Sequence, residues 1–372
     1  MKKIKIIADK YLNDNGLSIS IGGVETYIHN LCNLLIKMNY YIDVYQYGNI
    51  SKDCFFDGVN VHIIKQESRK KFVDLVRHAS IRVDYKNDLL LFASDLFVVR
   101  NNFKNVIAIQ HGIAWDIPTT IPKKDLSNYL FIIKGAIRTI VKYIRFKKCT
   151  YIVCVDYNFI NWYRTQINYI KNNILVIPNF SDYDENGYSR EDKECINIIF
   201  ARRLVEYRGT RIFVEAIKNI IIKYPNINVC IAGNGPEEKF MKKELNCFKN
   251  VIFTTYSSQD SIRFHSNYDI AVIPTLGSEG TSLSLLEAMS AGCSVIATYV
   301  GGISNILLNY YNGLIIEPNS KSLTEALEIL INDKELRTRL SKNAVETIRS
   351  SFSLDNWEKK WSNVFNEIER NK

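Results

Sequence analysis

Short apolar runs alternate with longer helical patterns along the whole chain, and this alternation restricts the fold more than any other feature. In the first half, strands are predicted at residues 3–8, 42–47, 61–65, 89–93, 106–110, 151–155 and 174–177. In the second half, strands are predicted at 196–201, 227–232, 251–254, 270–273, 294–297 and 313–316, and the principal helices at 24–38, 210–223, 283–290, 322–332, 333–350 and 354–368. A strand, helix, strand order of this kind predicts parallel sheets joined by right-handed crossovers, which is an α/β fold.

The length of the chain indicates two domains. At 372 residues it exceeds what one hydrophobic core usually supports, so two doubly wound, Rossmann-like domains are expected. A polar stretch without a strand pattern, residues 179–195, marks the seam between them. We therefore predict an N-terminal domain at residues 1–182, a C-terminal domain at 183–353 and a last helical segment at 354–372. That segment carries Trp357, Trp361 and Phe365 at four-residue spacing, which predicts an apolar face in the core.

Composition and cysteine usage are those of a globular protein of a reducing compartment. The chain is 47% hydrophobic and 23% charged. No apolar run approaches about 18 residues, so neither a membrane span nor a signal peptide is expected. The eight cysteines are scattered, without metal-ligand spacing, and Cys154, Cys230 and Cys293 fall in or beside strand patterns, where a free thiol packs as a small hydrophobe. A cytoplasmic protein is predicted.

The net charge of +9 is concentrated in the N-terminal half. Residues 1–180 carry 25 basic and 14 acidic side chains. Part of this excess forms a stripe between isoleucines, which indicates an amphipathic basic helix; its cations are Lys134, Arg138, Lys142 and Arg145. The stripe is either a solvated helix face or a contact with an anionic membrane surface, which would place the protein at the inner face of the membrane. Nucleic acid is not expected as a partner, because no recognition-helix or aromatic-interleaved basic pattern is present.

Two carboxylates, Glu279 and Glu287, stand eight residues apart across a predicted loop-to-helix junction that follows an apolar strand. If residues 280–287 are mostly helical, eight steps of about 100° bring the two side chains within about 80° of each other, so both can face one ligand. A helix N-terminus also offers unpaired N–H groups that can hold a pyrophosphate. The alternative is that Glu279 only complements the helix dipole and Glu287 is solvated.

Residues that can bind phosphate follow other predicted strands, and ligands bind at the carboxyl ends of strands in doubly wound sheets. Arg202, Arg203 and Arg208 lie on one loop that ends in glycine, and guanidinium groups make bidentate contacts with phosphate oxygens. Gly233-Asn234-Gly235-Pro236 follows the next strand, but no third glycine completes a dinucleotide fingerprint. Gly22-Gly23 precedes the first helix and either lets a backbone approach a ligand or makes a turn.

The chain resembles the family 4 retaining glycosyltransferases, which have the two-domain GT-B fold. The resemblance covers nearly the whole chain and rests on motifs that occur in the order expected for that family. These are Gly22-Gly23, Gln110-His111-Gly112, Ile177-Pro178-Asn179, the segment 203–209, Gly233-Asn234-Gly235-Pro236, the segment 279–289, Gly301-Gly302 and Asn312-Gly313.

The resemblance implies a role for each matching residue. Arg203 and Arg208 would grip the donor pyrophosphate, Glu279 would bind hydroxyls of the transferred sugar, and Glu287 would bind the nucleotide ribose. His111 would lie beside the donor sugar; alternatively it is a satisfied histidine at a strand end. The remaining donor-binding residues implied are Gly22, Gly23, Gly233, Thr281, Ser282 and Leu283. The last helix would return to the N-terminal domain.

Three positions depart from the family pattern. Arg208 stands where lysine is usual, and Asn305 stands where a glutamate often follows the later glycine pair. Arg202 occupies the place of a common glycine, so either Arg202 or Arg203 could face the phosphate.

We therefore predict a retaining transferase that moves a sugar from a nucleotide-diphosphate sugar to an acceptor hydroxyl, without a metal and without a cofactor. No D-x-D motif has a credible strand-end context, and the leaving phosphate would accept the acceptor proton. The acceptor would be a saccharide, such as a lipid-linked saccharide of cell-surface polysaccharide assembly. Two alternatives stay open: a nucleotide-sugar 2-epimerase, and a noncatalytic protein that binds sugar nucleotides or glycans. An NAD-dependent oxidoreductase is disfavoured by the missing third glycine.

Overall fold

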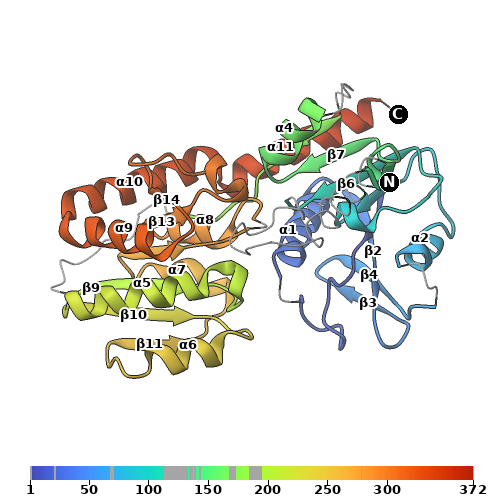
Figure 1. Cartoon of the computed structure of the whole chain (residues 1–372). Helices are drawn as coiled ribbons and strands as arrows, with labels where there is room; N and C mark the ends of the chain where they lie inside the picture. Colours follow the sequence, from blue (N-terminus) through green and yellow to red (C-terminus); the bar gives the residue numbers. More distant parts are fainter. Residues whose placement is uncertain are drawn as a thin grey trace. The chain divides into compact units, whose positions relative to one another are not determined.

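A computed structural model shows two α/β units, each built on its own sheet (Figure 1). The structure describes residues 2–20, 22–67, 71–112, 133, 137, 140, 141, 144–166, 173–183, 195–277 and 279–371. The first unit comprises Met1–His111, Lys123–Ile177 and Glu358–Lys372, and the second comprises Gly112–Pro122 and Pro178–Trp357. The main division between the two units, after Ile177, lies five residues before the seam expected at 182. The chain passes back from the second unit to the first within the last helix, between Trp357 and Glu358.

The first sheet has the strand order β3-β4-β2-β1-β5-β6-β7-β8. All of its neighbouring strands are parallel except β3 and β4. The strands are β1 (Lys2–Ile7), β2 (Tyr40–Tyr47), β3 (Lys52–Phe56), β4 (Val59–Ile64), β5 (Leu89–Phe92), β6 (Asn105–Gln110), β7 (Tyr151–Cys154) and β8 (Ile174–Val176).

Strand β3 was not predicted, and the expectation of purely parallel strands is wrong at this edge. Its sequence, KDCFF, has no apolar run, and most of its residues are exposed or half-buried. The hairpin to β4 is made by Asp57 and Gly58, which both have positive φ, at 46° and 80°. Asp-Gly is a strong hairpin signal, so this strand could have been found from its turn.

Among the described residues, helices with defined bounds in the first unit are α1 (Gly23–Lys37), α2 (Val73–Ala79), α4 (Tyr157–Gln166) and most of α11 (Leu354–Arg370). The predicted strands and helices omitted α2 and α4. In α11, Trp361 Nε1 donates a hydrogen bond to Tyr27 Oη of α1 at 2.8 Å, and Lys37 pairs with Glu358 at 2.7 Å. Trp357, Trp361 and Phe365 are buried, as their spacing predicted.

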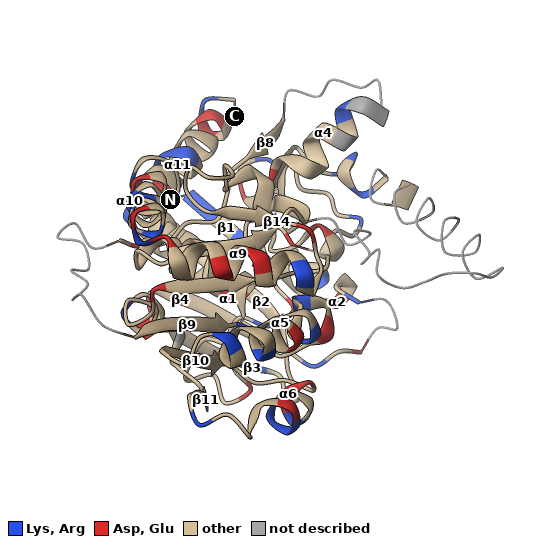
Figure 2. Ribbon diagram, turned by 60° about the vertical axis from the view of Figure 1, so that its left-hand side comes forward, with Lys and Arg blue, Asp and Glu red and all other residues tan. Residues whose placement is uncertain are grey.

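The second sheet is entirely parallel, with the order β11-β10-β9-β12-β13-β14. Its strands are β9 (Ile196–Ala201), β10 (Ile227–Ala232), β11 (Val251–Thr254), β12 (Ile270–Ile273), β13 (Ser294–Thr298) and β14 (Leu314–Ile316). None of these strands contains a charged residue; the charges of this unit lie on helices such as α5, α6 and α9 (Figure 2). Each strand agrees with its prediction to within one residue, because continuous apolar runs of this length identify buried parallel strands.

Helices cover both faces of the second sheet. Ile198 and Phe200 of β9 face one apolar cluster, and Ile199 and Ala201 face another. The first cluster is completed by α5 (Thr210–Lys223), α6 (Glu238–Leu245) and α9 (Ser320–Asn332), and the second by α8 (Leu283–Ser290) and α10 (Lys334–Ser351), with α7 (Ser261–His265) beside α8. Alternate side chains of one strand therefore pack into two apolar cores on opposite faces of the sheet, which is the doubly wound arrangement predicted from the sequence.

None of the eight cysteines, all of which are described, forms a disulfide, and Cys154, Cys230 and Cys293 are buried in the cores, as predicted. Within the described part of the chain, no helix has the length and apolar character needed to cross a bilayer.

Candidate active site

The carboxyl ends of β9 and β12 bring together a buried ionic cluster in the second unit. The loop after β9 supplies Arg202 and Arg208, and the loop after β12 supplies Thr275 and Glu279. Glu279 Oε2 accepts hydrogen bonds from Arg202 Nη2 at 2.9 Å, from Thr275 Oγ1 at 2.9 Å and from Arg208 Nη1. Two predicted site residues, Glu279 and Arg208, therefore meet at one oxygen atom.

Burial and charge pairing have opposite effects on the protonation of Glu279. The side chains of Arg202 and Glu279 are only 4% and 8% exposed, whereas that of Arg208 is 22% exposed. Burial by itself raises the pKa of Glu279, but the charges of Arg202 and Arg208 and the Thr275 hydrogen bond outweigh it, so the pKa lies below its usual value. Burial also lowers the pKa of Arg202, with Glu279 opposing this shift. The carboxylate is thus held ionised between two guanidinium groups.

Arg203 lies apart from this cluster. Its side chain is exposed, while the neighbouring Arg202 is buried against Glu279. From the sequence, Arg202 was considered only as an alternative to Arg203. The two arginines are adjacent, so one points inward and the other outward, and the sequence does not show which is which. The geometry favours Arg202 as the arginine that positions Glu279.

Glycines let the loops at the strand ends pack closely. A Cβ on Gly233, which has φ +139°, would lie 2.3 Å from the carbonyl oxygen of Arg202. A Cβ on Gly301, which has φ +59°, would lie 2.1 Å from the carbonyl oxygen of Glu279. Backbone atoms cannot yield to such contacts, so the structure gives both glycines a role in shaping the ionic cluster, beside the donor contact expected of Gly233.

Helix α8 begins at Leu283, directly after Ser282, which has extended backbone with φ −69° and ψ 113°. Residues 280–282 are therefore not helical, and the angular relation expected between Glu279 and Glu287 does not apply. Asn179 Nδ2 donates to the carbonyl oxygen of Thr281 at 2.6 Å, while its Oδ1 is buried without a hydrogen-bond partner among the described residues. Asn179 entered the sequence argument only as part of a motif, and the structure places it at the start of this helix.

Glu287 has a different environment from Glu279. Ser261 Oγ of α7 donates to Glu287 Oε2 at 2.7 Å, and His265 Nδ1 donates to the Ser261 carbonyl oxygen at 2.7 Å. Burial raises the pKa of Glu287 to about 7, with the Ser261 hydrogen bond acting in the opposite direction. Ser261 and His265 belong to none of the motifs described above and were not predicted as site residues. No contact between Glu279 and Glu287 links the two carboxylates.

His111, Gly22 and Gly23 belong to the first unit. His111 Nε2 donates to the carbonyl oxygen of Ala93 at 2.9 Å, so Nδ1 carries the free lone pair. Burial lowers the pKa of His111 to about 4, which keeps the ring neutral at physiological pH, and Tyr27 packs edge to face against it. Gly22 and Gly23 form the start of α1.

Some predicted residues lie outside the described part of the chain. These are Lys134, Arg138 and Lys142 of the basic stripe, whereas Arg145 is described. Among the described residues, no group of three or more His, Cys, Asp or Glu side chains is arranged to hold a metal ion.

Comparison with known proteins identifies the family of the second unit. Residues 185–347 match the family model of the glycosyl transferases group 1. The chain is 28% identical over 174 residues to the capsular polysaccharide biosynthesis glycosyltransferase CapM of Staphylococcus aureus, which is 45% of each chain. The match spans about half the length of several such relatives, including this one.

Solved structures agree with the fold. Sucrose-phosphate synthase from Thermosynechococcus elongatus superposes with a TM-score of 0.78 at 15% identity, covering 100% of both chains. HepE of Anabaena, solved in complex with UDP-glucose, superposes with a TM-score of 0.72 at 14% identity, covering 99% of this chain and 100% of HepE. The chain therefore has the GT-B fold, and its second unit is a glycosyl transferases group 1 domain.

Proposed function

We propose that this protein is a family 4 glycosyltransferase that moves a sugar from a nucleotide-diphosphate sugar to an acceptor hydroxyl with retention of configuration. The observation that carries this proposal is the Glu279 carboxylate held between Arg202 and Arg208 beside the start of α8. The family match of the second unit and the UDP-glucose bound by HepE support a nucleotide sugar as the donor.

The donor phosphates would lie against Arg208 and the first N–H groups of α8. Departure of the nucleoside diphosphate builds negative charge on the β-phosphate, and preorganised cations and N–H donors stabilise such charge. Arg208 is partly exposed and can reach a ligand, whereas Arg202 is engaged with Glu279 and Thr275. We assign Arg202 to positioning Glu279, and we leave Arg203 as a second contact for phosphate.

Glu279 and Glu287 would bind different parts of the donor. The hydrogen bonds of Glu279 converge on Oε2, so its other oxygen can accept a hydrogen bond from a hydroxyl of the transferred sugar. Glu287 would accept a hydrogen bond from the ribose. Asn179 Oδ1 and Arg202 Nε are buried without partners among the described residues and provide one acceptor and one donor for a ligand. His111 offers its neutral Nδ1 to a sugar hydroxyl.

At the anomeric carbon the reaction breaks one bond and forms one, and a proton moves from the acceptor hydroxyl to the leaving phosphate. The bond between the anomeric carbon and the β-phosphate oxygen breaks, and its electron pair stays on the phosphate. The acceptor oxygen attacks the same face of the anomeric carbon, and its proton passes to the leaving phosphate oxygen. The guanidinium groups and helix N–H groups supply the positive charge this requires, so we propose a reaction without a metal.

The acceptor is proposed to be a lipid-linked saccharide in cell-surface polysaccharide assembly. The name of CapM, with its role in capsular polysaccharide biosynthesis, supports this class. The basic excess of the N-terminal half suits an acceptor presented at an anionic membrane, to which Lys134, Arg138, Lys142 and Arg145 would bind from the cytoplasmic side.

A thermal-shift screen against UDP-, GDP-, dTDP- and ADP-sugars tests the donor assignment. A ligand present at one hundred times its Kd should stabilise the protein by about 2.7 kcal/mol. The Glu279→Gln variant should lose the shift given by the best sugar nucleotide. No shift with any member of the panel would contradict a nucleotide-sugar site.

The product then tests the reaction. NMR of the glycoside should show the anomeric configuration of the donor, and turnover should survive EDTA. An inverted product would contradict retention, and loss of turnover in EDTA would contradict metal independence. Conversion of the donor sugar without an acceptor would favour the 2-epimerase, and donor binding without turnover would favour a noncatalytic binding protein.

A further inference from the structure

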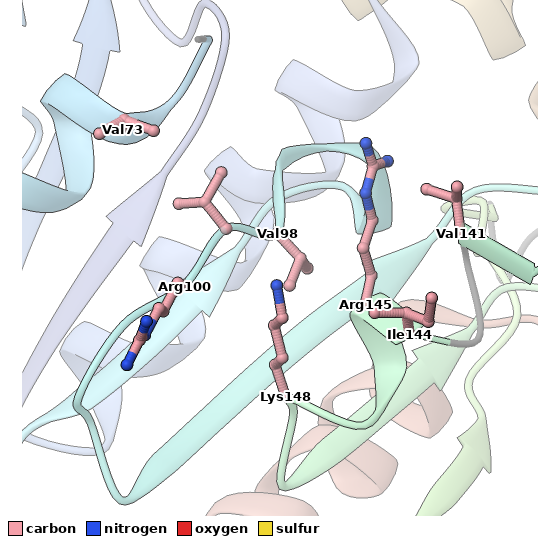
Figure 3. Close-up of a pocket in the computed structure, with 8 residues that line it drawn as sticks. Val73, Val98, Arg100, Val141, Ile144, Arg145 and Lys148 are labelled. Atoms are coloured by element: carbon pink, nitrogen blue, oxygen red, sulfur yellow. The ribbon is translucent and has the colours of Figure 1, made fainter.

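An apolar pocket with basic side chains lies in the first unit. Its volume is about 390 Å³, within the range of pockets that hold small ligands. Five of its lining side chains are apolar and three are cationic (Figure 3). They come from the start of α2, from the segment before β6 and from the helical residues before β7: Val73, Val98, Val99, Arg100, Val141, Ile144, Arg145 and Lys148.

The three cations of this pocket have no counter-ions among the described residues. Arg100 and Lys148 are exposed, Arg145 is half-buried, and no acidic side chain lines the pocket. Elsewhere in the described chain, buried cations such as Lys5 and Arg202 are paired with carboxylates. Three unpaired positive charges beside one cavity favour an anionic ligand.

Exposed aliphatic side chains occur at two of the pocket residues and at three positions that precede them in the sequence. They are 39% to 57% exposed, and each belongs to a residue with helical backbone: Ile133, Ile137, Ile140, Val141 and Ile144. Their spacing along the chain, mostly three or four residues, is the sequence pattern of one apolar helix face. Val141 and Ile144 belong both to this face and to the pocket. An apolar face next to unpaired cations is the pattern of a surface that binds at the interface of a bilayer.

We propose that this pocket binds an anionic phospholipid of the membrane surface. One acyl chain would lie against Val98, Val141 and Ile144, and the phosphate would bind Arg100, Arg145 and Lys148. This proposal rests on the membrane-located acceptor proposed above and adds the site by which the protein recognises the lipid. A nucleotide or a free phosphate would leave the apolar wall unused, and a neutral lipid would leave the three cations unused.

The test measures binding to phosphatidylcholine vesicles that contain phosphatidylglycerol, by co-sedimentation of the full chain. Each charge near an anionic surface strengthens binding about fivefold, so the triple variant R100Q/R145Q/K148Q should bind about a hundredfold more weakly. The matched control K239Q/K249Q/K342Q removes three exposed, unpaired lysines of the second unit and should bind nearly as well as the unchanged protein. Equal losses in the two triple variants, or no loss in either, would overturn the proposal.

The apolar wall needs its own variant. V141S/I144S changes two exposed side chains and should weaken vesicle binding at least fivefold, whereas I222S/I252S, two exposed positions of the second unit, should not. Soluble dihexanoyl phosphatidylglycerol should shift NMR signals of the pocket, and dihexanoyl phosphatidylcholine and inorganic phosphate should not. Phosphate binding as strong as that of the short-chain lipid would mark a simple anion site and overturn the lipid assignment.

Nucleotide-sugar binding by thermal shift separates this proposal from the proposed function. The triple variant should keep the shift, because its three residues lie outside the second unit. If the triple variant still binds vesicles as well as the unchanged protein and also binds sugar nucleotides, only the proposed lipid site is overturned. If vesicle binding weakens in the variants as expected but sugar nucleotides do not bind, only the proposed transferase function is overturned.

Discussion

Arginine side chains lie in opposite surroundings in the two units. In the second unit, Arg202 is buried and hydrogen-bonded to Glu279 and Thr275, and Arg208 shares the same carboxylate. In the first unit, Arg100 and Arg145 border an apolar pocket without a counter-ion among the described residues. Paired, buried charges hold a fixed geometry, which suits a site that must position reacting atoms. Unpaired, accessible charges act over a distance, which suits recognition of a charged surface.

The largest effect on stability is expected at the paired charges of the second unit. Replacing Glu279 with Gln leaves Arg202 buried beside Arg208 without an opposing charge, so the free energy of unfolding should fall by about 3–5 kcal/mol. Urea unfolding followed by circular dichroism measures this change. Arg203→Gln, at an exposed position of the same loop, should stay within about 0.5 kcal/mol of the unchanged protein. A loss below about 1 kcal/mol for Glu279→Gln would mean that the ionic cluster does not hold the loops together.

The second expected effect is a pH dependence from Glu287. Its pKa is raised from 4.5 to about 7 in the folded chain, so between these values the unfolded chain has released a proton that the folded chain keeps. The free energy of unfolding should therefore fall as the pH rises from 4.5 to 7, by at most about 3 kcal/mol.

The Glu287→Gln variant provides the control, because its side chain does not titrate. The difference in unfolding free energy between variant and unchanged protein should grow in favour of the variant from pH 5 to pH 8. Ribose binding by the carboxylate should also make sugar-nucleotide affinity rise over this range in the unchanged protein alone. A constant difference between the two proteins at both pH values would contradict the raised pKa.

The third expected effect distinguishes the two neighbouring arginines of the β9 loop. Arg202→Gln removes a hydrogen-bond donor that positions Glu279, and turnover of the sugar nucleotide should fall about a hundredfold. Arg203→Gln should reduce turnover only a few fold if Arg203 is a secondary contact. Measuring kcat and KM separately is informative, since loss of positioning lowers kcat and loss of a phosphate contact raises KM. The reverse ranking would assign the inward role to Arg203.

The smallest expected effect is the response to salt, and it sharpens the comparison directly. Raising NaCl from about 50 to about 500 mM shortens the screening length and should weaken binding to phosphatidylglycerol vesicles about tenfold. Sugar-nucleotide binding to the second unit, where the charges are paired and partly buried, should change less than about threefold. Isothermal titration calorimetry and co-sedimentation give the two curves, and equal salt responses would remove the distinction between the two sites.

The predicted elements differ in how well local patterns specify them. The strands of the second sheet agree with their predictions because each is a continuous apolar run, and β3 was missed because its residues are mostly exposed. The helix predicted at 283–290 is confirmed as α8, whereas the assumption that residues 280–287 are mostly helical fails, since the small residues before Leu283 fit either a loop or a helix turn.

The sequence by itself determined the parallel strands of the two sheets, their order along the chain and the charged residues that follow the strands, but not the antiparallel strand β3. These properties follow from the two-residue period of strands and the 3.6-residue period of helices, which are local. Only the tertiary structure decided that Arg202 meets Glu279, since the two are 77 residues apart and meet through neighbouring strand ends. It also decided that burial raises the pKa of Glu287, against the opposing effect of the Ser261 hydrogen bond, while two arginines lower that of Glu279. Likewise, it brought Arg100 and Arg145 to the lining of one apolar pocket, because burial and long-range pairing depend on how the chain packs and are absent from any window of sequence.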